Sequence, residues 1–429
     1  MKILPHAPHG VRGTLVLPGD KSVTHRALIF GALATGTTVL TGISLGEDCL
    51  TTLAILDNFQ IQLQRSLDTV RIIGRPLQAW RPRKTVLNFN NSGTAVRLFM
   101  GLLASGAWTL KLLGDASLTQ RPMQRVAEPL RQLGAKIMTT EQHLPVVMTG
   151  QNLTGTKVVL PIASAQVKSA VILAALHAQG ATTIVEKWPT RNHTELLLEQ
   201  FGGRIKTASD QKTITIWPKT VLQAQELVIP GDLSAAAFWL TAAVIVPHSQ
   251  LKLKHVGLNP TRSGFLRVLQ QMGANLTVQR QTRTGEIVGD LLIQSSQLTA
   301  IQLTASQIPS IIDELPLVAL LAAYAEGTST ITGAQELHYK ETDRIQTVAQ
   351  ELQKLGVKIQ TQPDGWLIQG STDWQWNHEP LDSHGDHRLA MMLSIAVLNL
   401  PTGIPLANER SVAISYPQFW QDLNTIIGV

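Results

Sequence analysis

Residues 340–344 carry four charges in five positions, in a chain of 429 residues of which only 15% are charged. Lys340 and Arg344 supply two cations, and Glu341 and Asp343 supply two carboxylates. They open the stretch Ile345–Leu355, where apolar residues recur at steps of three and four, a spacing that predicts an amphipathic helix. Such a cluster could be a solvated helix cap. It could also bind an anion and move protons beside it, and similar clusters elsewhere favour this second interpretation.

Polar clusters also open six apolar stretches of the chain. These clusters are Asp20-Lys21-Ser22 with Arg26, Asn91-Ser92-Gly93-Thr94 with Arg97, Ser164-Ala165-Gln166 with Lys168 and Ser169, Asp232 with Ser234, Asp313-Glu314, and Asp386-His387-Arg388. Serine, threonine and aspartate at helix starts are ordinary N-caps. That interpretation is sufficient for Ser92, Asp232 and Ser234.

Cations at these helix starts indicate a bound anion. Lys21, Arg26 and Arg388 stand where the positive end of the helix dipole disfavours them. An anion would attract both these side chains and the backbone N–H groups of the first turn. Gly93 would let such an anion approach the main chain closely.

Arginine also precedes amphipathic stretches, at Arg121, Arg191 and Arg344. A guanidinium binds carboxylate or phosphate through a planar two-pronged contact that lysine cannot reproduce. Each arginine alone could form a surface ion pair. Their recurrence favours anionic ligands.

Two carboxylates are candidates for acid–base chemistry. Asp313 follows Ile311-Ile312 and precedes Leu315, an apolar setting that disfavours its charged form. Glu341 is next to Lys340 and three residues from Arg344. Proton transfer beside anionic substrates uses carboxylates in such settings. His384 and His387 are three apart without an evident third ligand, so we predict no metal site.

Composition narrows the class of protein. The length favours two domains, and 44% hydrophobic residues indicate a packed globular enzyme. The net charge of +6 is spread along the chain and only 5% of residues are aromatic, so small anionic substrates explain it better than nucleic acid. No apolar run is long enough to span a bilayer and no signal stretch opens the chain, so we expect a cytoplasmic protein. The single cysteine, Cys49, excludes an internal disulfide and is expected to be a buried helix residue.

Two glycine patterns recur at steps of about 70 residues and predict six copies of one unit. The first, Leu-x-x-Leu/Phe/Met-Gly, places its glycines at Gly134, Gly202, Gly273 and Gly356. The second, Ala-x-Gly-Thr/Ala, places them at Gly36, Gly106, Gly180 and Gly327. We expect each glycine to end a helix as its left-handed C′ residue, with a strand following.

The elements predicted around these glycines are of two kinds. Six helices are apolar nearly all round and should be buried: Ala27–Ala34, Arg97–Ala104, Ala170–Ala178, Ala235–Val246, Leu315–Ala325 and Leu389–Leu398. Four are amphipathic and should cover the outside: Met123–Leu133, Glu195–Phe201, Phe265–Met272 and Ile345–Leu355. This predicts an α/β fold with three units in each of two domains.

The tripeptides Pro18-Gly19-Asp20 and Pro230-Gly231-Asp232 are the candidate crossovers between the domains. One domain is then residues 20–230, and the other is residues 1–19 plus 231–429. We expect the active site in the cleft between them.

The ordered set of motifs, with its Lys340–Arg344 run, resembles the 5-enolpyruvylshikimate-3-phosphate (EPSP) synthase family over nearly the whole chain. The resemblance implies two domains, each of three βαβαββ units about a pseudo-threefold axis. It implies transfer of the enolpyruvyl group of phosphoenolpyruvate to the 5-hydroxyl of shikimate 3-phosphate, with release of phosphate and without cofactor or metal. We expect a monomer with no nucleic-acid or membrane partner.

The resemblance also implies roles for individual residues. The residues implied to bind shikimate 3-phosphate are Lys21, Ser22, Arg26, Ser164, Ala165, Gln166, Arg191, Asp313 and Lys340. Those implied to bind phosphoenolpyruvate are Lys21, Gly93, Arg121, Gln166, Arg344 and Arg388. Asp313 is the implied base on the 5-hydroxyl, and Glu341 with Lys21 is implicated in proton transfer at the methylene carbon.

Three positions depart from the family pattern. Ala165 replaces a serine that would contact the sugar phosphate, Leu98 replaces a proline, and Ile414 replaces a lysine expected near phosphoenolpyruvate. Family membership also implies inhibition by glyphosate at the phosphoenolpyruvate site, where Gly93 leaves space.

Two alternatives remain open at this point. The related UDP-N-acetylglucosamine enolpyruvyl transferase has the same architecture, but it usually carries a cysteine on a mobile loop, and Cys49 lies in no such setting. A non-catalytic protein that binds nucleic-acid ends on the same repeated unit would not need Asp313, Glu341 and the arginines together.

Overall fold

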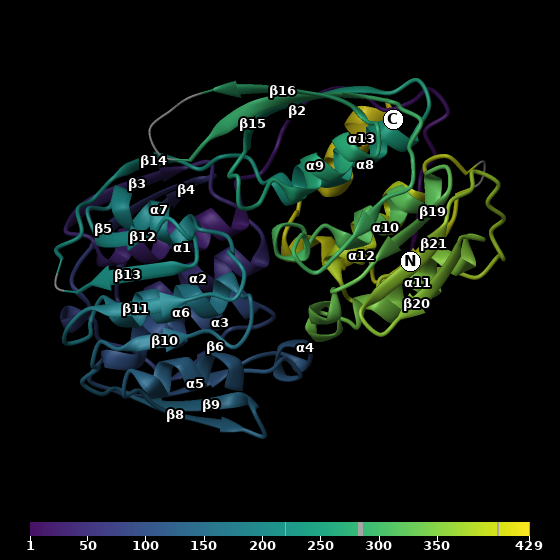
Figure 1. Ribbon diagram of the computed structural model, residues 1–429. Helices are drawn as coiled ribbons and strands as arrows, with labels where there is room; N and C mark the ends of the chain where they lie inside the picture. Colours follow the sequence, from purple (N-terminus) through teal and green to yellow (C-terminus); the bar gives the residue numbers. More distant parts are fainter. Residues whose placement is uncertain (219, 282–285, 401–402, 429) are drawn as a thin grey trace. The chain divides into compact units, whose positions relative to one another are not determined.

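The computed structural model describes residues 1–218, 220–281, 286–400 and 403–428 (Figure 1). It divides into two compact units, Gly19–Ile229 and Met1–Pro18 with Pro230–Val429, so both divisions fall at the Pro-Gly-Asp tripeptides. None of the helices in the described ranges has the length and apolar character to span a membrane.

The core of the unit 19–229 is built on three buried helices. They are α1 (Lys21–Leu33), α3 (Gly93–Leu102) and α6 (Ala165–Ala175). Helix α3 packs against both α1 and α6. Each helix starts at the polar cluster ahead of its apolar run, because the N-caps Asp20, Ser92 and Ser164 accept hydrogen bonds from first-turn N–H groups. The predicted buried helices are thus confirmed in this unit.

In the described part of this unit, three four-stranded sheets with the same pairing pattern surround these helices. The strand order of the first sheet is β14 (Glu226–Val228), β3 (Gly36–Thr41), β5 (Thr69–Gly74), β4 (Gln62–Ser66). That of the second is β6 (Val86–Asn88), β7 (Thr109–Leu113), β9 (His143–Thr149), β8 (Lys136–Thr140). That of the third is β10 (Lys157–Val159), β11 (Thr182–Val185), β13 (Thr213–Trp217), β12 (Arg204–Thr207). In each sheet the first pair is parallel and the other pairs are antiparallel. The remaining helices of this unit are α2 (Glu47–Asn58), α4 (Ala116–Thr119), α5 (Gln124–Gln132) and α7 (His193–Gln200).

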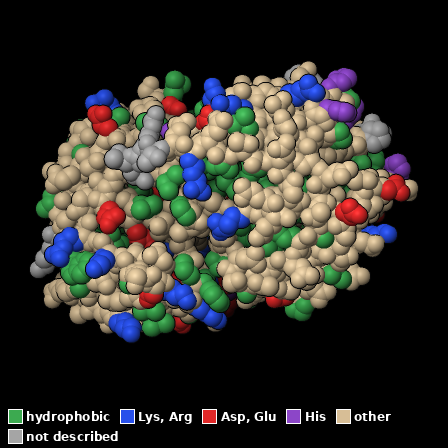
Figure 2. All heavy atoms as spheres, turned by 45° about the horizontal axis from the view of Figure 1, so that its top comes forward, with side chains coloured by type: hydrophobic (Ala, Val, Ile, Leu, Met, Phe, Trp, Pro, Cys, Tyr) green, Lys and Arg blue, Asp and Glu red, His purple; other side chains and the backbone are tan. Residues whose placement is uncertain are grey.

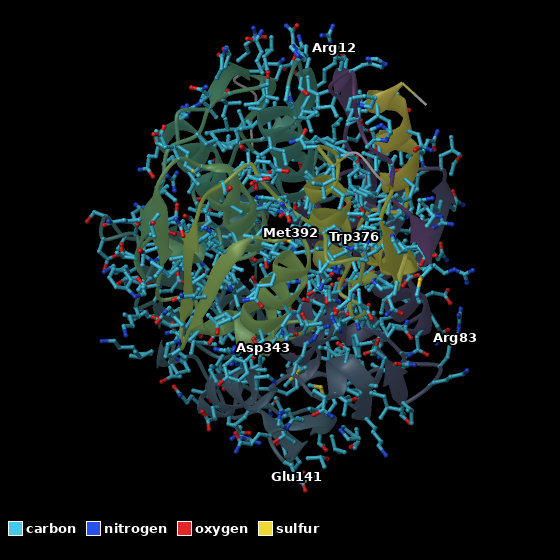
Figure 3. The ribbon with its side chains drawn as sticks, turned by 90° about the vertical axis from the view of Figure 1, so that its right-hand side faces the viewer. Arg12, Arg83, Glu141, Asp343, Trp376 and Met392 are labelled. Atoms are coloured by element: carbon cyan, nitrogen blue, oxygen red, sulfur yellow. The ribbon has the colours of Figure 1, made fainter. Side chains whose placement is uncertain are left out.

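The second unit repeats this plan. Its buried helices α8 (Leu233–Ile245), α10 (Leu315–Tyr324) and α12 (His387–Ala396) pack pairwise against one another. Met392 lies in the interior on α12 (Figure 3). Two sheets have the order of the first unit: β2 (Arg12–Val16), β15 (Gln250–Gly257), β17 (Val288–Gln294), β16 (Asn275–Gln281); and β18 (Gln302–Leu303), β19 (Thr328–Ile331), β21 (Gly365–Gln369), β20 (Lys358–Gln362). The other helices are α9 (Gly264–Gln271), α11 (Arg344–Lys354) and α13 (Phe419–Ile427).

The sixth copy is shorter than the sequence pattern predicts. Among the described residues its sheet has three strands, β22 (Leu381–Asp382), β23 (Pro405–Ala407) and β1 (Lys2–Ile3). The 3₁₀ segment η5 (Glu409–Ile414) follows β23 and precedes the amphipathic helix α13, just as the 3₁₀ segment η4 (Gln335–Tyr339) precedes α11. The sixth copy therefore keeps a buried and an amphipathic helix, and its sheet in the described residues is the smaller one.

The first strand of two copies comes from a distant part of the chain. Strand β2, which precedes α1 in the chain, pairs in parallel with β15, and β14, which precedes α8, pairs in parallel with β3. At each crossover the strand before it therefore belongs to one unit and the helix after it to the other, and residues 1–18 form one unit with the residues from 230 onward.

The left-handed glycines of the first pattern are confirmed. All four have φ between 84° and 95° and follow directly on the C-caps of α5, α7, α9 and α11: Gly134, Gly202, Gly273 and Gly356. In the second pattern, Gly36, Gly180 and Gly327 also have positive φ, but they lie beyond C′: Gly36 is the first residue of β3, and the other two directly precede or lie close to the next strand.

Gly106 departs from this pattern. Its φ is −78°, because α3 continues into the 3₁₀ segment η2 (Leu103–Ser105) before the chain becomes extended. A Cβ at Gly106 would lie 1.8 Å from the Trp108 ring. Glycine is therefore needed here for close packing, and the prediction of a left-handed residue is wrong.

Candidate active site

The start of α3 is enclosed by two arginines in the unit 19–229. Gly93 is the first residue of α3, and a Cβ there would lie 3.0 Å from Nη1 of Arg121 and 3.1 Å from Nη1 of Arg97. Arg97 donates from Nη1 to Oε1 of Gln166 at 2.6 Å, and Gln166 donates from Nε2 to the hydroxyl of Thr94 at 3.0 Å. The structure thus brings together Gly93, Arg121 and Gln166, three residues predicted to bind phosphoenolpyruvate.

Arg121 is held in place by neutral acceptors. It is buried in the connection between α4 and α5, and its Nη2 donates to Oδ1 of Asn91 at 2.8 Å and to Oγ of Ser117 at 3.2 Å. Asn91 in turn donates to Asp115, the N-cap of α4. These contacts fix the guanidinium group of Arg121 beside Gly93, the first residue of α3.

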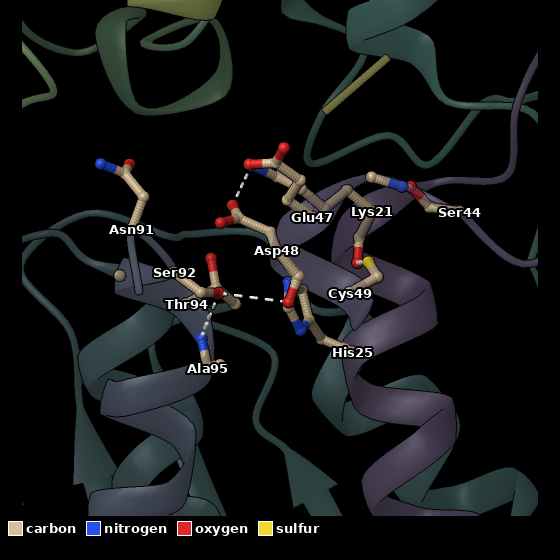
Figure 4. A network of polar contacts seen from close by, with 12 residues as sticks. Lys21, His25, Ser44, Glu47, Asp48, Cys49, Asn91, Ser92, Thr94 and Ala95 are labelled. Carbon is tan, nitrogen blue, oxygen red and sulfur yellow. Dashed lines mark hydrogen bonds and ion pairs between the residues drawn. The ribbon is translucent and has the colours of Figure 1, made fainter. Parts of the chain in front are cut away.

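Lys21 belongs to the same network (Figure 4). Its Nζ pairs with Oδ2 of Asp48 at 2.8 Å, and the backbone carbonyl of Asp48 accepts from the hydroxyl of Ser92, the N-cap of α3, at 3.4 Å. Cys49 is buried beside them in α2, its thiol directed to the carbonyl of Lys21 at 3.7 Å. Burial, and next Asp48, raise the pKa of this thiol, and the position of Cys49 inside α2 confirms the prediction of a buried helix residue.

His25 shows the electrostatic effect of the cations. It is buried in α1, with Nδ1 2.7 Å from the hydroxyl of Thr52. Burial, followed by the charges of Lys21 and Arg26, holds its pKa well below the ordinary value. The imidazole is therefore neutral beside the cationic site.

Arg26 occupies a buried position between α1, α6 and α7. Its Nε donates to the hydroxyl of Thr194 at 2.6 Å, its Nη2 to the hydroxyl of Ser169 at 2.8 Å, and its Nη1 to the carbonyl of Ser22 at 2.9 Å. Thr194 and Ser169 were missed in the sequence as partners of Arg26. They could not be found by spacing, since they lie 168 and 143 residues away.

The remaining predicted residues of this unit stand at helix starts. Ser164 is the N-cap of α6, accepting from the Val167 N–H at 3.4 Å, and Ala165 is the first residue of α6. Arg191 is half-buried in the segment between β11 and α7, three residues before Thr194. Ser164 and Ala165 thus lie at the start of the helix that carries Gln166, and Arg191 lies just before the helix that carries Thr194.

Asp313 is the centre of a second cluster, in the other unit. It precedes α10, and its Oδ1 accepts from Nζ of Lys340 at 3.2 Å. Arg388, from the start of α12, donates from Nη1 to the Asp313 carbonyl at 3.0 Å and has Nη2 3.9 Å from Oδ2. Burial lowers the pKa of Lys340, and Asp313 acts in the opposite direction.

Glu341 and Arg344 form an ion pair in the same cluster. Nη2 of Arg344 lies 2.6 Å from Oε2 of Glu341, and Nε lies 2.7 Å from Oδ2 of Asp386, the N-cap of α12. Burial opposes the charge of Arg344, but Asp386 and Glu341 together raise its pKa. The structure thus places Asp313 and Lys340, and Glu341 and Arg344, as two carboxylate–cation pairs.

Arg262 is a site arginine that the sequence reasoning missed. Its Nη2 lies 2.7 Å both from Oδ1 of Asp232 and from Oγ of Ser234, and Ser234 also contacts Glu314 and Arg388. Asp232 is the N-cap of α8 as predicted, but the interpretation of it and Ser234 as caps alone is wrong. The repeat could have pointed to Arg262, because Arg262 stands 11 residues before Gly273, just as Arg191 stands 11 residues before Gly202.

The charges of these clusters determine which ligands they can bind and which reactions they can support. Buried arginines and lysines at helix starts suit phosphate and carboxylate groups, and carboxylates held by cations suit proton transfer. No group of three His, Cys, Asp or Glu side chains in the described ranges could hold a metal ion. On the face shown in Figure 2, Lys and Arg form small separate groups with Asp and Glu among them.

Comparison with known proteins places this chain in a family. A profile of the family described as EPSP synthase (3-phosphoshikimate 1-carboxyvinyltransferase) matches residues 5–423. The 3-phosphoshikimate 1-carboxyvinyltransferase of Lactiplantibacillus plantarum is 53% identical over 414 residues, which is 96% of both chains. That of Limosilactobacillus fermentum is 49% identical over 98% of this chain and 97% of its own.

Solved structures support the same assignment. EPSP synthase from Acinetobacter baumannii superposes with a TM-score of 0.85 at 40% identity, covering 99% of this chain and 97% of its own. The enolpyruvyl transferase NikO from Streptomyces tendae has a TM-score of 0.76 at 18% identity, covering 99% and 97%, and this likeness concerns the fold alone. The predicted fold class is confirmed, and the chain belongs to the EPSP synthase (3-phosphoshikimate 1-carboxyvinyltransferase) family.

Proposed function

We propose that this chain transfers the enolpyruvyl group of phosphoenolpyruvate to the 5-hydroxyl of shikimate 3-phosphate and releases phosphate. In the addition step the hydroxyl oxygen bonds to C2 of phosphoenolpyruvate, its proton goes to a base, and C3 gains a proton. In the elimination step C3 loses a proton and the C–O bond to phosphate breaks. The reaction is the one by which the family and the relatives above are named.

The cluster of unit 19–229 would bind the phosphorylated acceptor. Arg26 with Ser22, Ser164 with Gln166, and Arg191 stand at the starts of α1, α6 and α7. Buried guanidinium groups beside N-terminal backbone N–H groups favour a phosphate. The absence of a hydroxyl at Ala165 leaves the N–H groups of the first turn of α6 to make that contact.

The residues proposed to bind phosphoenolpyruvate are Lys21 and Arg121, with Gly93 and Gln166, in unit 19–229, and Arg344 and Arg388 in the other unit. Two anions repel each other in a common site, and these cations offset that repulsion. The sequence lacks the family's lysine at Ile414, so Arg344 and Arg388 would supply the positive charge at that end.

The observation that carries the proposal is the pair of carboxylates, each held by a cation. Asp313, 3.2 Å from Lys340, would accept the proton of the 5-hydroxyl. Glu341, 2.6 Å from Arg344, would deliver and remove the proton at C3 together with Lys21. As part of the proposal, the enzyme is cytoplasmic, acts as a monomer on these two small substrates, and has no nucleic-acid or membrane partner.

A phosphate-release assay tests this function. The purified chain is mixed with phosphoenolpyruvate and, in turn, shikimate 3-phosphate, UDP-N-acetylglucosamine or no acceptor. We expect phosphate release with shikimate 3-phosphate alone and an enol ether at its 5-oxygen by NMR. Release with the UDP-sugar instead, or none with either acceptor, would contradict the proposal.

A further inference from the structure

Lys168 is a buried cation that contacts two carboxylates. Its side chain is 1% exposed on α6, and Nζ lies 2.9 Å from Oε2 of Glu186 and 2.7 Å from Oε1 of Glu195. Nζ also donates to the backbone carbonyl of Thr190 at 3.2 Å. The three hydrogens of the ammonium group therefore have three acceptors.

These acceptors span the connection between β11 and α7. Glu186 directly follows β11, Thr190 lies within the connection, and Glu195 lies in the first turn of α7. The hydroxyl of Thr190 donates to Oε1 of Glu186 at 2.5 Å, which closes the cluster. One lysine of α6 thus holds both ends and the middle of segment 186–195.

The same segment carries residues of the proposed acceptor site. Arg191 directly follows Thr190, and Thr194, which accepts from Nε of Arg26, directly precedes Glu195. Ser169, which accepts from Nη2 of Arg26, directly follows Lys168. A shift of the lysine cluster would therefore displace the partners of Arg26 and the backbone of Arg191.

The charges of the cluster indicate that it positions the chain more than it stabilises the fold. One cation faces two buried carboxylates, and burial raises the pKa of Glu186 while Lys168 opposes that rise. A buried ion cluster adds little net stability over apolar side chains of similar volume, because its desolvation is costly. Its effect is to fix the segment in one conformation.

We propose that Lys168 is a positioning residue for shikimate 3-phosphate, holding segment 186–195 so that Arg26 and Arg191 keep the spacing that the sugar phosphate requires. Lys168 itself does not touch the substrate. This inference rests on the proposed function of the site.

The test is Lys168→Met in the full chain, a change that keeps the length of the side chain and removes its charge. We expect the Kd of shikimate 3-phosphate by calorimetry, and its KM, to rise on the order of tenfold. The KM of phosphoenolpyruvate should stay within about threefold, since its cations lie on other segments. Lys252→Met is the matched control, because Lys252 pairs at 3.0 Å with Asp290 and is 36% exposed, and it should change neither constant.

A second variant covers the case in which Lys168→Met does not fold. Glu195→Gln leaves one cation and one anion in the cluster, keeps the side-chain volume, and should still raise the Kd of shikimate 3-phosphate several-fold. An unchanged Kd in a folded variant, or KM values for both substrates that rise in equal proportion, overturns the inference. A wild-type chain that binds shikimate 3-phosphate but releases no phosphate would refute the proposed function, while the Kd comparison would still decide the role of Lys168.

Discussion

Arg344 contacts both carboxylate oxygens of Asp386, with Nε 2.7 Å from Oδ2 and Nη2 3.1 Å from Oδ1. The two residues are 42 positions apart in the chain and both are buried. Asp386 also caps α12 by accepting from the backbone N–H of Arg388 at 2.8 Å. One carboxylate therefore orients two of the arginines assigned to phosphoenolpyruvate.

Asp386→Asn should destabilise the protein by about 2–4 kcal/mol, because a buried guanidinium loses one of its two carboxylate partners. The control is Asp57→Asn, whose partner Arg83 lies at the surface (Figure 3) in a 2.7 Å pair with both side chains more than half exposed. That change should cost about 0–1 kcal/mol. Denaturant unfolding of both variants measures the difference, and equal losses would contradict the importance of the Arg344–Asp386 contact.

Asp313→Asn should lower kcat on the order of 10²–10⁴-fold, the usual range for removal of a general base. The amide retains the size of the side chain but cannot accept the hydroxyl proton. Steady-state kinetics of phosphate release provide the measurement, with Asp290→Asn on β17 as the matched change outside the cluster. A turnover number like that of the wild type would remove Asp313 from the mechanism.

Gly93→Ala should weaken inhibition by glyphosate. The new Cβ would meet Nη1 of Arg121 at 3.0 Å and Nη1 of Arg97 at 3.1 Å, so both guanidinium groups must shift by a few tenths of an ångström. We expect the inhibition constant to rise at least on the order of tenfold, or about 1.4 kcal/mol, with a smaller rise in the KM of phosphoenolpyruvate. The KM of shikimate 3-phosphate serves as the internal control. Tight inhibition that survives the change would argue against placing the inhibitor beside Gly93.

His338 should make stability depend on pH. It lies in the 3₁₀ segment η4 (Gln335–Tyr339), just before residues 340–344, and its nitrogens lie 2.8 Å from Oδ2 of Asp343 and 3.0 Å from the Pro363 carbonyl. Both partners can only accept, so both nitrogens donate and the ring is charged. The Pro363 carbonyl, and next Asp343, raise the pKa of His338 above its ordinary value.

Because the pKa of His338 is higher in the folded than in the unfolded protein, the charged ring stabilises the fold fully below pH 6.5, the pKa of the unfolded side chain. This stabilisation is lost as the pH rises through the pKa of His338 in the folded protein. His338→Gln should therefore cost on the order of 1 kcal/mol near pH 5.5 and clearly less near pH 9. Denaturant unfolding at the two pH values tests this, with the exposed His378→Gln as a control that should show no such difference. A loss for His338→Gln that is equal at both pH values would mean that the ring is not charged in the folded protein.

The sequence alone predicted the features that depend on residues close by in the chain, within one or two helical turns. The N-caps Asp20 and Asp343 accept from N–H groups two to three residues ahead, and Gly356 ends α11 with a left-handed φ. Such contacts follow from residue type and local spacing, so a motif is enough to predict them. The repeat of about 70 residues likewise predicted the buried helices and the elements on which the site residues lie.

Which side chains contact one another depends on the three-dimensional packing of the chain. Arg26 reaches Thr194 across 168 residues, Arg344 reaches Asp386 across 42, and strand β2 pairs with β15 although it precedes α1 in the chain. These contacts depend on how helices and sheets pack, and that is determined by the whole set of apolar faces in each unit. A charged residue in a motif has many possible partners, and packing selects one of them.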